Sequence, residues 1–380
     1  ADGVRLLKEF SSRSLDRVAS FGELLSTTIF HFLCLENSLK PILIDARKVI
    51  KTDSNFTSAK VLMKPTKRNA IKIIGTELGI NLQKENLQFA NANHQKALES
   101  NISFQYENFD KEIKANKKTK LVITQGFIAS NLLNKTTTLG RGGSDLSAAI
   151  LGSCINANEI RIYTDVDGIL TSDPKIIKNW KLINKISFDE VKELSFFGAK
   201  VVHPDTIYPA LVKNIPVRIL NTFNTNSRGT LICSESNINK SEFKSIVLKK
   251  DCLLFDIKFN AKNNMHLYLN KFLKFFKRRE IKIYFQSFSV SRITFLLEKH
   301  SDINFLIEQI PSKLNYKLVE VNLLVICGND ILKSEKEKYK IIFNDLLLKN
   351  ENCSFIGFTN NSLIAAVLPD SSELIANQIH

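Results

Sequence analysis

A glycine-rich segment between a strand pattern and a helix pattern constrains the fold of this chain more than any other feature. The segment, Thr136–Asp145, has the sequence Thr-Thr-Thr-Leu-Gly-Arg-Gly-Gly-Ser-Asp. An apolar run at Leu121–Ile128 precedes it, and apolar residues at helical spacing follow it from Leu146. Three glycines and an arginine therefore lie between a buried strand and a helix, and we expect Ser144 or Asp145 to cap that helix.

The same segment has the chemistry of a loop that binds anions. Glycines let backbone N–H groups come close to a ligand, and a helix N-terminus favours negative charge. Arg141 adds a planar guanidinium group that suits a carboxylate or a phosphate. An ordinary tight turn can have this composition too, so other segments must decide between the two interpretations.

The composition indicates a globular chain with more than one domain. A length of 380 residues allows two or three cores, and 44% hydrophobic with 24% charged residues is typical of folded proteins. We find no apolar run of membrane-spanning length and no signal-peptide pattern, so we expect a cytoplasmic protein without a membrane partner. Six scattered cysteines form no Cys-x-x-Cys pair, so we predict neither zinc nor disulfides.

The net charge of +15 raises the question of a nucleic-acid partner. The lysines, however, are spread among many Asn, Ile and Phe residues, whereas the chain has only 14 glycines and one tryptophan. This bias is typical of an AT-rich genome. We therefore expect no nucleic-acid partner.

Alternating helix and strand patterns predict an α/β fold. Leu15–Phe30 has the spacing of an amphipathic helix, and Pro41–Asp45 and Ile160–Tyr163 have strand patterns. Ser187 and Glu190 form a predicted capping box, whereas the polar region 64–119 carries no motif. The alternation favours a mainly parallel sheet sandwiched by helices, with ligands beyond the carboxyl ends of the strands.

The last part of the chain has a different pattern. After about residue 236, strand-helix-strand-strand-helix occurs twice, the second time with helices at 336–349 and 372–379. This predicts two ferredoxin-like βαββαβ modules without a cluster of acid, base and nucleophile. We therefore divide the chain into a first domain at 1–236 and binding modules at 237–318 and 319–380.

Five motifs, taken in order, resemble those of the aspartate kinases in the amino-acid-kinase family. They are Ser20–Ser26, Thr124–Ile128, Thr136–Asp145, Tyr163–Pro174 and Phe197–Pro204. The resemblance covers roughly Ser14 to Cys233, and the C-terminal modules resemble that family's paired ACT regulatory domains. It implies the amino-acid-kinase fold, without its first strands, and transfer of the γ-phosphoryl group of ATP to the β-carboxylate of L-aspartate. The product, 4-phospho-L-aspartate, is the entry to lysine, threonine and methionine biosynthesis.

The resemblance also implies roles for individual residues. Glu23 would accept the α-ammonium group of aspartate, Arg141 would hold a substrate carboxylate, and Asp145 would orient a catalytic lysine and the phosphate site. The other residues implied to line the substrate pocket are Phe127, Gly142 and Ser144. Those implied to bind ATP are Thr164, Asp165, Leu170, Lys175, Lys200 and Val201. ATP and Mg²⁺ are the implied cofactors, and no metal ligand is predicted among the side chains.

The chemistry of this reaction agrees with the residue types. A carboxylate acceptor is already an anion near neutral pH, so no general base is needed. The protein has to position two anions and neutralise the charge that spreads over the transferred group. Glycine, arginine, lysine and hydroxyl groups do this work, and the motifs are rich in them.

Several positions depart from the family's pattern. The phosphate loop Lys-Phe-Gly-Gly-Thr-Ser is not found near Ala1, and loss of its lysine would lower the rate on the order of 10³-fold. We therefore expect the chain as given to be a poor kinase. Leu146 and Leu170 replace a frequent tyrosine, and Lys175 a frequent arginine. Ile283–Ser289 lacks an acidic residue that holds the effector, which leaves inhibition by lysine or threonine open; the ACT modules imply a homodimer.

Three alternatives stay open at this point. Asp165-Val-Asp-Gly resembles the loop of haloacid-dehalogenase-type phosphatases, with Asp165 as nucleophile and Asp167 as acid. A degenerate kinase could act as an amino-acid sensor or scaffold. The chain could also be the kinase part of a bifunctional protein with homoserine dehydrogenase, because it stops at His380 inside a helix pattern.

Overall fold

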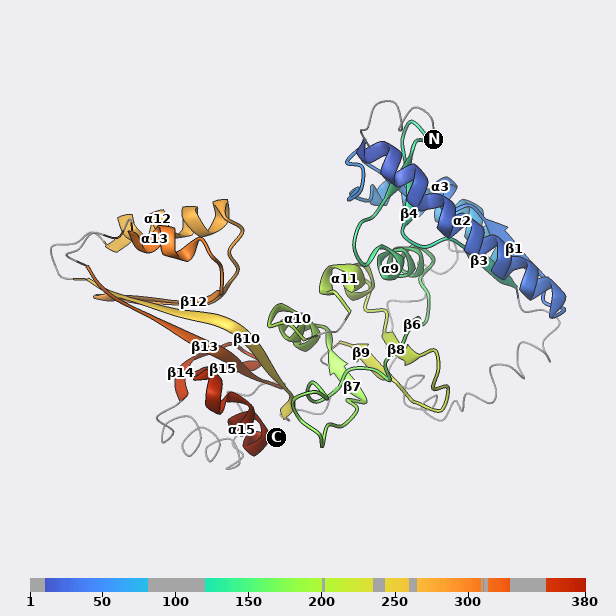
Figure 1. Ribbon diagram of the computed structural model, residues 1–380. Coiled ribbons are helices and arrows are strands. Elements are labelled where there is room, and N and C mark those ends of the chain that lie inside the picture. Colours follow the sequence, from blue (N-terminus) through green and yellow to red (C-terminus); the bar gives the residue numbers. More distant parts are fainter. Residues whose placement is uncertain are drawn as a thin grey trace, which may run out of the picture. The chain divides into compact units, whose positions relative to one another are not determined.

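A computed structural model describes residues 11–80, 120–199, 202–234, 243–259, 265–308, 310, 314–328 and 353–380 (Figure 1). The chain forms two compact units. Unit 1 comprises Ala1–Asp167 and Val202–Ser234, and unit 2 comprises Gly168–Val201 and Glu235–His380. The three domain bounds proposed from the sequence stay a prediction.

Unit 1 is an α/β structure. Its helices are α2 (Ser12–Glu36), α3 (Ala46–Val49), α4 (Met63–Ala70), the π-helix η1 (Ile71–Gly75), α5 (Thr76–Leu78), α9 (Gly143–Ile155) and α11 (Pro204–Val212). Its strands are β1 (Pro41–Ile44), β2 (Lys51–Thr52), β3 (Leu121–Thr124), β4 (Ile128–Asn131), β5 (Thr136–Thr138), β6 (Ile160–Thr164), β8 (Val217–Asn221) and β9 (Thr230–Cys233).

Parallel pairing dominates unit 1, as the sequence patterns predict. β1 pairs with β3, β2 with β4, and β6 with β8, all in parallel, whereas β5 and β9 join as antiparallel partners of β4 and β8. Apolar side chains of α3 with its C-cap residue, β4 and α9 form one core cluster, among them Val49, Ile50, Ala129 and Ile150. α9 and α11 lie side by side (Figure 1).

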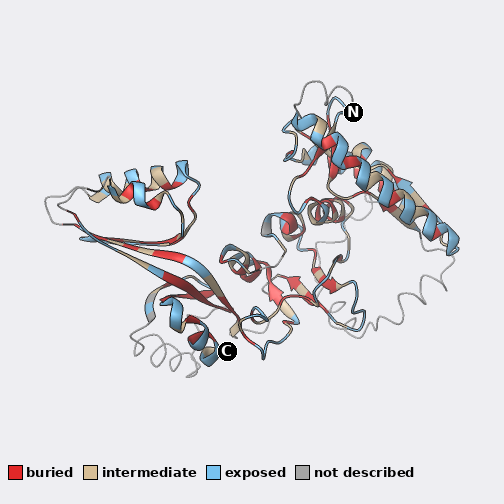
Figure 2. Cartoon of the chain, in the orientation of Figure 1, coloured by how far each residue is buried: buried red, intermediate tan, exposed pale blue. Residues whose placement is uncertain are grey.

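Helix α2 is less buried than its sequence suggests. Figure 2 shows it exposed along most of its length, with a narrow buried stripe. Apolar side chains such as Phe21, Leu25 and Ile29 are more than half exposed. The sequence analysis found no apolar run of membrane-spanning length, and this was wrong: α2 is long and apolar enough by length and composition alone. Asp16 and Glu23 on this helix instead accept hydrogen bonds from the backbone of unit 1.

Unit 2 is built on an antiparallel sheet. Its helices are α10 (Phe188–Phe196), α12 (Met265–Arg278), α13 (Ile303–Glu308) and α15 (Pro369–Ile379). Its strands are β7 (Lys185–Ser187), β10 (Phe243–Lys258), β11 (Ile283–Ser289), β12 (Arg292–Glu298), β13 (Asn315–Gly328), β14 (Cys353–Phe358) and β15 (Ser362–Val367). Six of them form one sheet in the order β11-β12-β10-β13-β15-β14. The capping box of Ser187 and Glu190 is confirmed at the start of α10.

The two ferredoxin-like halves of this sheet share their long central strands. Residues 252–258 of β10 pair with β12, whereas residues 243–249 pair with the end of β13 that also carries β15. A register shift between Lys249 and Cys252 separates the two stretches. The second half of the sheet therefore includes residues 243–249, which precede the first half in the sequence. The two modules are nested rather than consecutive. The helix expected at 336–349 lies outside the described residues.

An aromatic core holds the first half of the sheet to its helices. Phe255, Phe272, Phe276 and Phe295 are almost completely buried, and their ring centroids lie 5.2 to 6.1 Å apart in edge-to-face pairs. α12 and α13 cover one face of the sheet there (Figure 1). Edge-to-face pairs add to the stabilisation that burial of each ring supplies.

Candidate active site

The glycine-rich segment forms the turn between β5 and α9. Gly140 and Gly142 have φ angles of +76° and +70°, a region that glycine enters without strain. Gly142 is the N-cap of α9, and the helix begins at Gly143 without a side-chain cap. The prediction of a Ser144 or Asp145 cap was wrong, because left-handed Gly142 already ends the turn and leaves both residues inside the first helical turn.

Two loops pack against each other at this helix N-terminus. A Cβ atom on Gly143 would lie 2.7 Å from Cβ of Phe127, and one on Gly126 would lie 2.9 Å from Oγ of Ser144. Only glycine therefore allows this close approach. Phe127 has a φ of +40°, which is rare for a residue other than glycine, and its carbonyl accepts a hydrogen bond from the Leu139 N–H at 2.9 Å.

Glu23 reaches this site from helix α2. Its Oε1 accepts a hydrogen bond from the N–H of Gly126 at 2.9 Å, although the two residues are 103 positions apart. The side chain is half-buried, and its second oxygen has no hydrogen-bond partner within the described ranges. Glu23, Gly126 and Ser144 are therefore neighbours, and Arg141 lies exposed three residues before Ser144. The five residues predicted for the substrate pocket therefore all belong to this turn or to the segments beside it, namely Glu23, Phe127, Arg141, Gly142 and Ser144.

Asp145 is the acidic member of the turn. It lies in the first turn of α9, where negative charge is favoured, and it is half-buried. Burial raises the pKa of its carboxyl group. Among the residues described, no cationic side chain pairs with it. A metal ion or a lysine ammonium group near Asp145 would stabilise its charged form.

The acidic loop follows strand β6 in unit 1. Thr164 ends this strand, and its hydroxyl donates to Oδ1 of Asp165 at 3.1 Å. Oδ1 of Asp167 accepts hydrogen bonds from the amide groups of Asn221 at 2.8 Å and Asn224 at 3.0 Å. Asp167 thus ties the loop to the end of β8, and Asp165 is left exposed.

A sequence model of the amino acid kinase family matches residues 2–221. The chain belongs to this family. The resemblance of the five motifs to this family is therefore confirmed. Because the chain belongs to this family, the Asp165-Val-Asp-Gly segment no longer favours a haloacid-dehalogenase-type phosphatase.

Relatives of this amino acid kinase are aspartokinases. The bifunctional aspartokinase/homoserine dehydrogenase of Buchnera aphidicola is 36% identical over 236 residues, which are 59% of this chain and 29% of the relative. The chloroplastic aspartokinase 3 of Arabidopsis thaliana is 30% identical over 85% of this chain and 52% of its own length. The chain thus spans about half or less of these curated relatives.

Solved structures resemble this kinase over both of its units. Aspartokinase III of E. coli, in complex with lysine and aspartate, covers 97% of this chain and 75% of its own, with a TM-score of 0.70 and 26% identity. The aspartate kinase of Clostridium acetobutylicum has a TM-score of 0.73 over 96% of this chain and 74% of its own at 22% identity, which shows the fold. The predicted α/β domain with ferredoxin-like regulatory modules is confirmed.

The remaining residues predicted to bind ATP lie outside this turn. Leu170 and Lys175 belong to unit 2, where Leu170 forms an isolated antiparallel bridge with Leu182 and Lys175 is exposed. Lys200 and Val201 lie outside the described residues. Their roles stay predictions.

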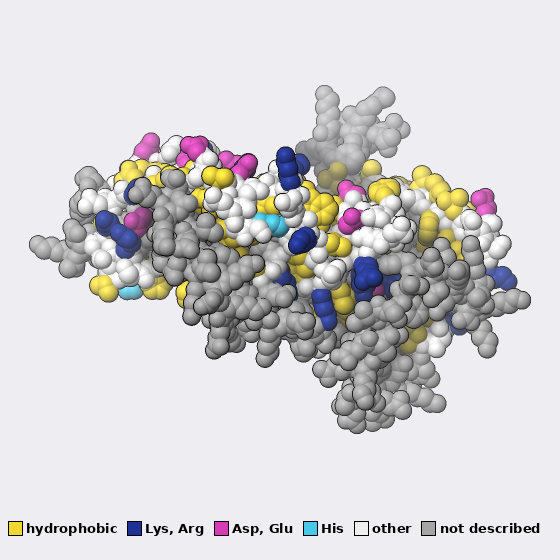
Figure 3. Space-filling model, turned by 90° about the horizontal axis from the view of Figure 1, so that it is seen from below, with side chains coloured by type: hydrophobic (Ala, Val, Ile, Leu, Met, Phe, Trp, Pro, Cys, Tyr) yellow, Lys and Arg dark blue, Asp and Glu magenta, His cyan; other side chains and the backbone are white. Residues whose placement is uncertain are grey.

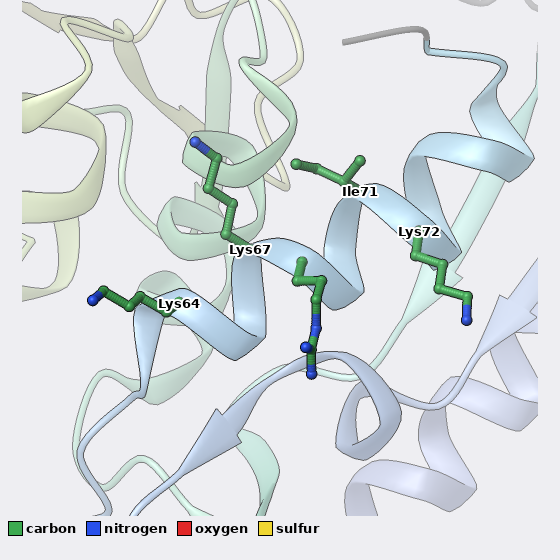
Figure 4. A pocket seen from close by; sticks show the side chains of 5 residues that line it. Lys64, Lys67, Ile71 and Lys72 are labelled. Carbon is green, nitrogen blue, oxygen red and sulfur yellow. The ribbon is translucent and has the colours of Figure 1, made fainter. Parts of the chain in front are cut away.

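A basic hollow elsewhere in unit 1 does not have the geometry of a ligand site. It has a volume of about 540 Å³ and is lined by α4 and η1, and its residues are Lys64, Lys67, Arg68, Ile71 and Lys72. Figure 4 shows Lys64, Lys67 and Lys72 pointing in different directions from the helix. On the face that Figure 3 shows, the Lys and Arg side chains of the described residues form separate groups between polar and apolar ones. These cations therefore do not converge on one anion.

The sequence analysis missed one buried residue beside the site. Asp16, on α2, is only 1% exposed and binds the backbone around the glycine turn. Its position was a usable signal, because it precedes Glu23 by seven residues, or two helical turns, and so shares its face of the helix.

Proposed function

We propose that the chain is an aspartate kinase, which transfers the γ-phosphoryl group of ATP to the β-carboxylate of L-aspartate and releases 4-phospho-L-aspartate and ADP. The observation that carries this proposal is the pairing of Glu23 with Gly126 beside the turn of Arg141 and Ser144. One carboxylate oxygen of Glu23 that has no hydrogen-bond partner among the described residues, and the exposed guanidinium group of Arg141 in the adjoining turn, match the ammonium and carboxylate groups of an amino acid.

The residues of the turn have separable tasks in this reaction. Glu23 binds the ammonium group, and Arg141 binds a carboxylate of the substrate. The β-carboxylate is already ionised and attacks without a base, so catalysis depends on position and charge. Backbone N–H groups at the start of α9 favour negative charge on the reacting groups. Bound Mg²⁺ would screen the charge of the ATP phosphates, and Asp145 is the carboxylate of the turn whose charge such a cation would stabilise.

Two related structures support the ligands of this proposal. Aspartokinase III of E. coli has been solved with aspartate and ADP, and with lysine and aspartate. We propose the same substrate and nucleotide here, and lysine or threonine as an effector of the C-terminal modules. A homodimer and a cytoplasmic location are further predictions.

The test is an assay of ADP release with Mg²⁺-ATP, in which hydroxylamine traps the acyl phosphate as a hydroxamate. We expect ADP and hydroxamate to form, at the low rate that the sequence predicts for this chain, only when L-aspartate is present, and D-aspartate to give neither. Arg141→Ala should abolish both, whereas the exposed Arg13→Ala serves as the matched control and should not. Calorimetric titration with L-aspartate complements the assay.

The outcomes of this test separate the alternatives. Binding of L-aspartate without ADP release would favour an amino-acid sensor that has lost kinase activity. Absence of both binding and ADP release would refute the proposal.

A further inference from the structure

We propose that Asp16 is a positioning residue, which fixes the glycine turn and the orientation of Arg141 without touching the substrate. The Asp16 carboxylate is 1% exposed. Its oxygens accept hydrogen bonds from the Thr57 N–H at 2.9 and 3.0 Å, from the Thr138 N–H at 3.1 Å and from the Thr138 hydroxyl at 2.7 Å. Within the described part of unit 1, no cationic side chain pairs with it.

A buried carboxylate without a cationic partner depends on these donors. Removing a charge from water is unfavourable unless hydrogen bonds replace its hydration, and bonds to an ionised acceptor are about twice as strong as neutral ones. Three donors from two segments, Thr57 and Thr138, therefore have to be held in place around Asp16. The carboxylate in turn fixes the two segments against each other.

These two segments enclose the first glycine of the turn. Thr138 is the last residue of β5 and precedes Gly140 by two positions. Thr57 has an unusual φ of +72°, and its carbonyl oxygen would lie 3.2 Å from a Cβ atom on Gly140. Thr57 and Thr138 therefore set the path of the chain into Arg141, and both donate hydrogen bonds to Asp16.

Helix α2 thereby fastens both loops of the site. Asp16 and Glu23 are two turns apart on one helix face, at a spacing that the helix holds rigid. Asp16 binds Thr138 at the end of β5, where the glycine turn begins, and Glu23 binds the loop of Gly126. The role of Arg141 rests on the proposed function. Under that function Glu23 contacts the substrate, whereas Asp16 holds the turn in place without contacting the substrate.

The test measures how readily the glycine turn opens, and it does not depend on kinase activity. Arg141 is exposed, and trypsin cleaves after it only when the turn can leave its folded path. We expect Asp16→Asn, which keeps the shape but places an amide N–H against a backbone donor, to speed cleavage at Arg141–Gly142 at least about 10-fold in mass spectrometry. Glu36→Gln, an exposed charge change on the same helix, is the control and should leave the rate unchanged. Equal rates for Asp16→Asn and wild type would overturn the proposal.

A second variant covers the case in which Asp16→Asn fails to fold. Thr138→Val removes one of the donors to Asp16 but keeps the backbone N–H, and Thr138→Ser restores the hydroxyl. We expect faster cleavage at Arg141 in the valine variant and rescue in the serine variant. Cleavage sites in unit 2 report global unfolding, and faster cleavage at all sites alike would refute a local role.

The binding of L-aspartate keeps the two proposals distinguishable. If wild type binds L-aspartate, Asp16→Asn should weaken that binding and leave the melting temperature of unit 2 unchanged. If wild type does not bind it, the proposed function fails, whereas the cleavage pattern still decides the role of Asp16.

Discussion

The sharpest consequence of the site geometry concerns Glu23→Gln. Oε1 of Glu23 accepts a hydrogen bond from the Gly126 N–H at 2.9 Å, and the amide oxygen of a glutamine can accept the same bond. The variant therefore keeps the contact between α2 and the Gly126 loop. It loses only the charge of the second oxygen, which the proposed function assigns to the ammonium group of L-aspartate.

The expected size of the effect follows from the kind of bond that is lost. A hydrogen bond to a charged group contributes about 1.5 to 3 kcal/mol. With about 1.4 kcal/mol for each factor of ten, Glu23→Gln should weaken L-aspartate binding by about 10- to 150-fold. The affinity for ATP should stay the same, because Glu23 is assigned no contact with the nucleotide.

Calorimetric titration of wild type and variant measures both affinities. Glu36→Gln changes charge in the same way at the exposed end of α2 and is the matched control. An aspartate affinity within about twofold of wild type would refute the role of Glu23 as the ammonium partner, since the missing interaction should exceed tenfold. A parallel fall in ATP affinity and melting temperature would show that Glu23 is structural instead.

Three further predictions concern stability. Phe255→Ala removes a completely buried ring, so urea unfolding of unit 2 should lose about 3–5 kcal/mol, and a loss below about 1 kcal/mol would contradict the assigned core. Lys244→Met leaves the buried Glu190 carboxylate without the ammonium group that lies 2.8 Å away and should lose about 3–5 kcal/mol in the same assay, whereas an unchanged unfolding midpoint would contradict the burial of this ion pair. Burial raises the pKa of Asp45, but its hydrogen bonds with Arg47 outweigh burial and hold the pKa below its ordinary value. This stabilisation is present above the unfolded-state pKa and is lost as the pH falls through the lower folded-state pKa. Asp45→Asn should therefore destabilise the protein at neutral pH and not in strong acid, and an equal effect at both would refute the ion pair's role.

Elements defined by neighbours in sequence were predicted closely. The strand expected at Pro41–Asp45 is Pro41–Ile44 in the structure, and the strand expected at Ile160–Tyr163 is Ile160–Thr164. The capping box of Ser187 is confirmed because its partners lie three residues apart. Such features depend on local periodicity and capping, which the sequence displays directly.

The start of α9 shows where local rules are insufficient. Ser144 is a good capping residue by type, yet the cap is Gly142, whose φ of +70° is set in a turn packed against Thr206 of α11. Propensity alone cannot rank these two residues, because the contact that decides comes from another part of the chain. The same holds for the nested sheet, in which residues 243–249 pair with the far end of β13.

The sequence by itself determined the family, the glycine turn and the types of residue that serve a carboxylate substrate, because these depend on residue identity and short spacing. Only the tertiary structure showed that Glu23 binds the Gly126 N–H across 103 residues and that Asp16 binds Thr138 across 122. A carboxylate's role depends on which donors surround it, and donors so distant in sequence meet only when the chain has folded.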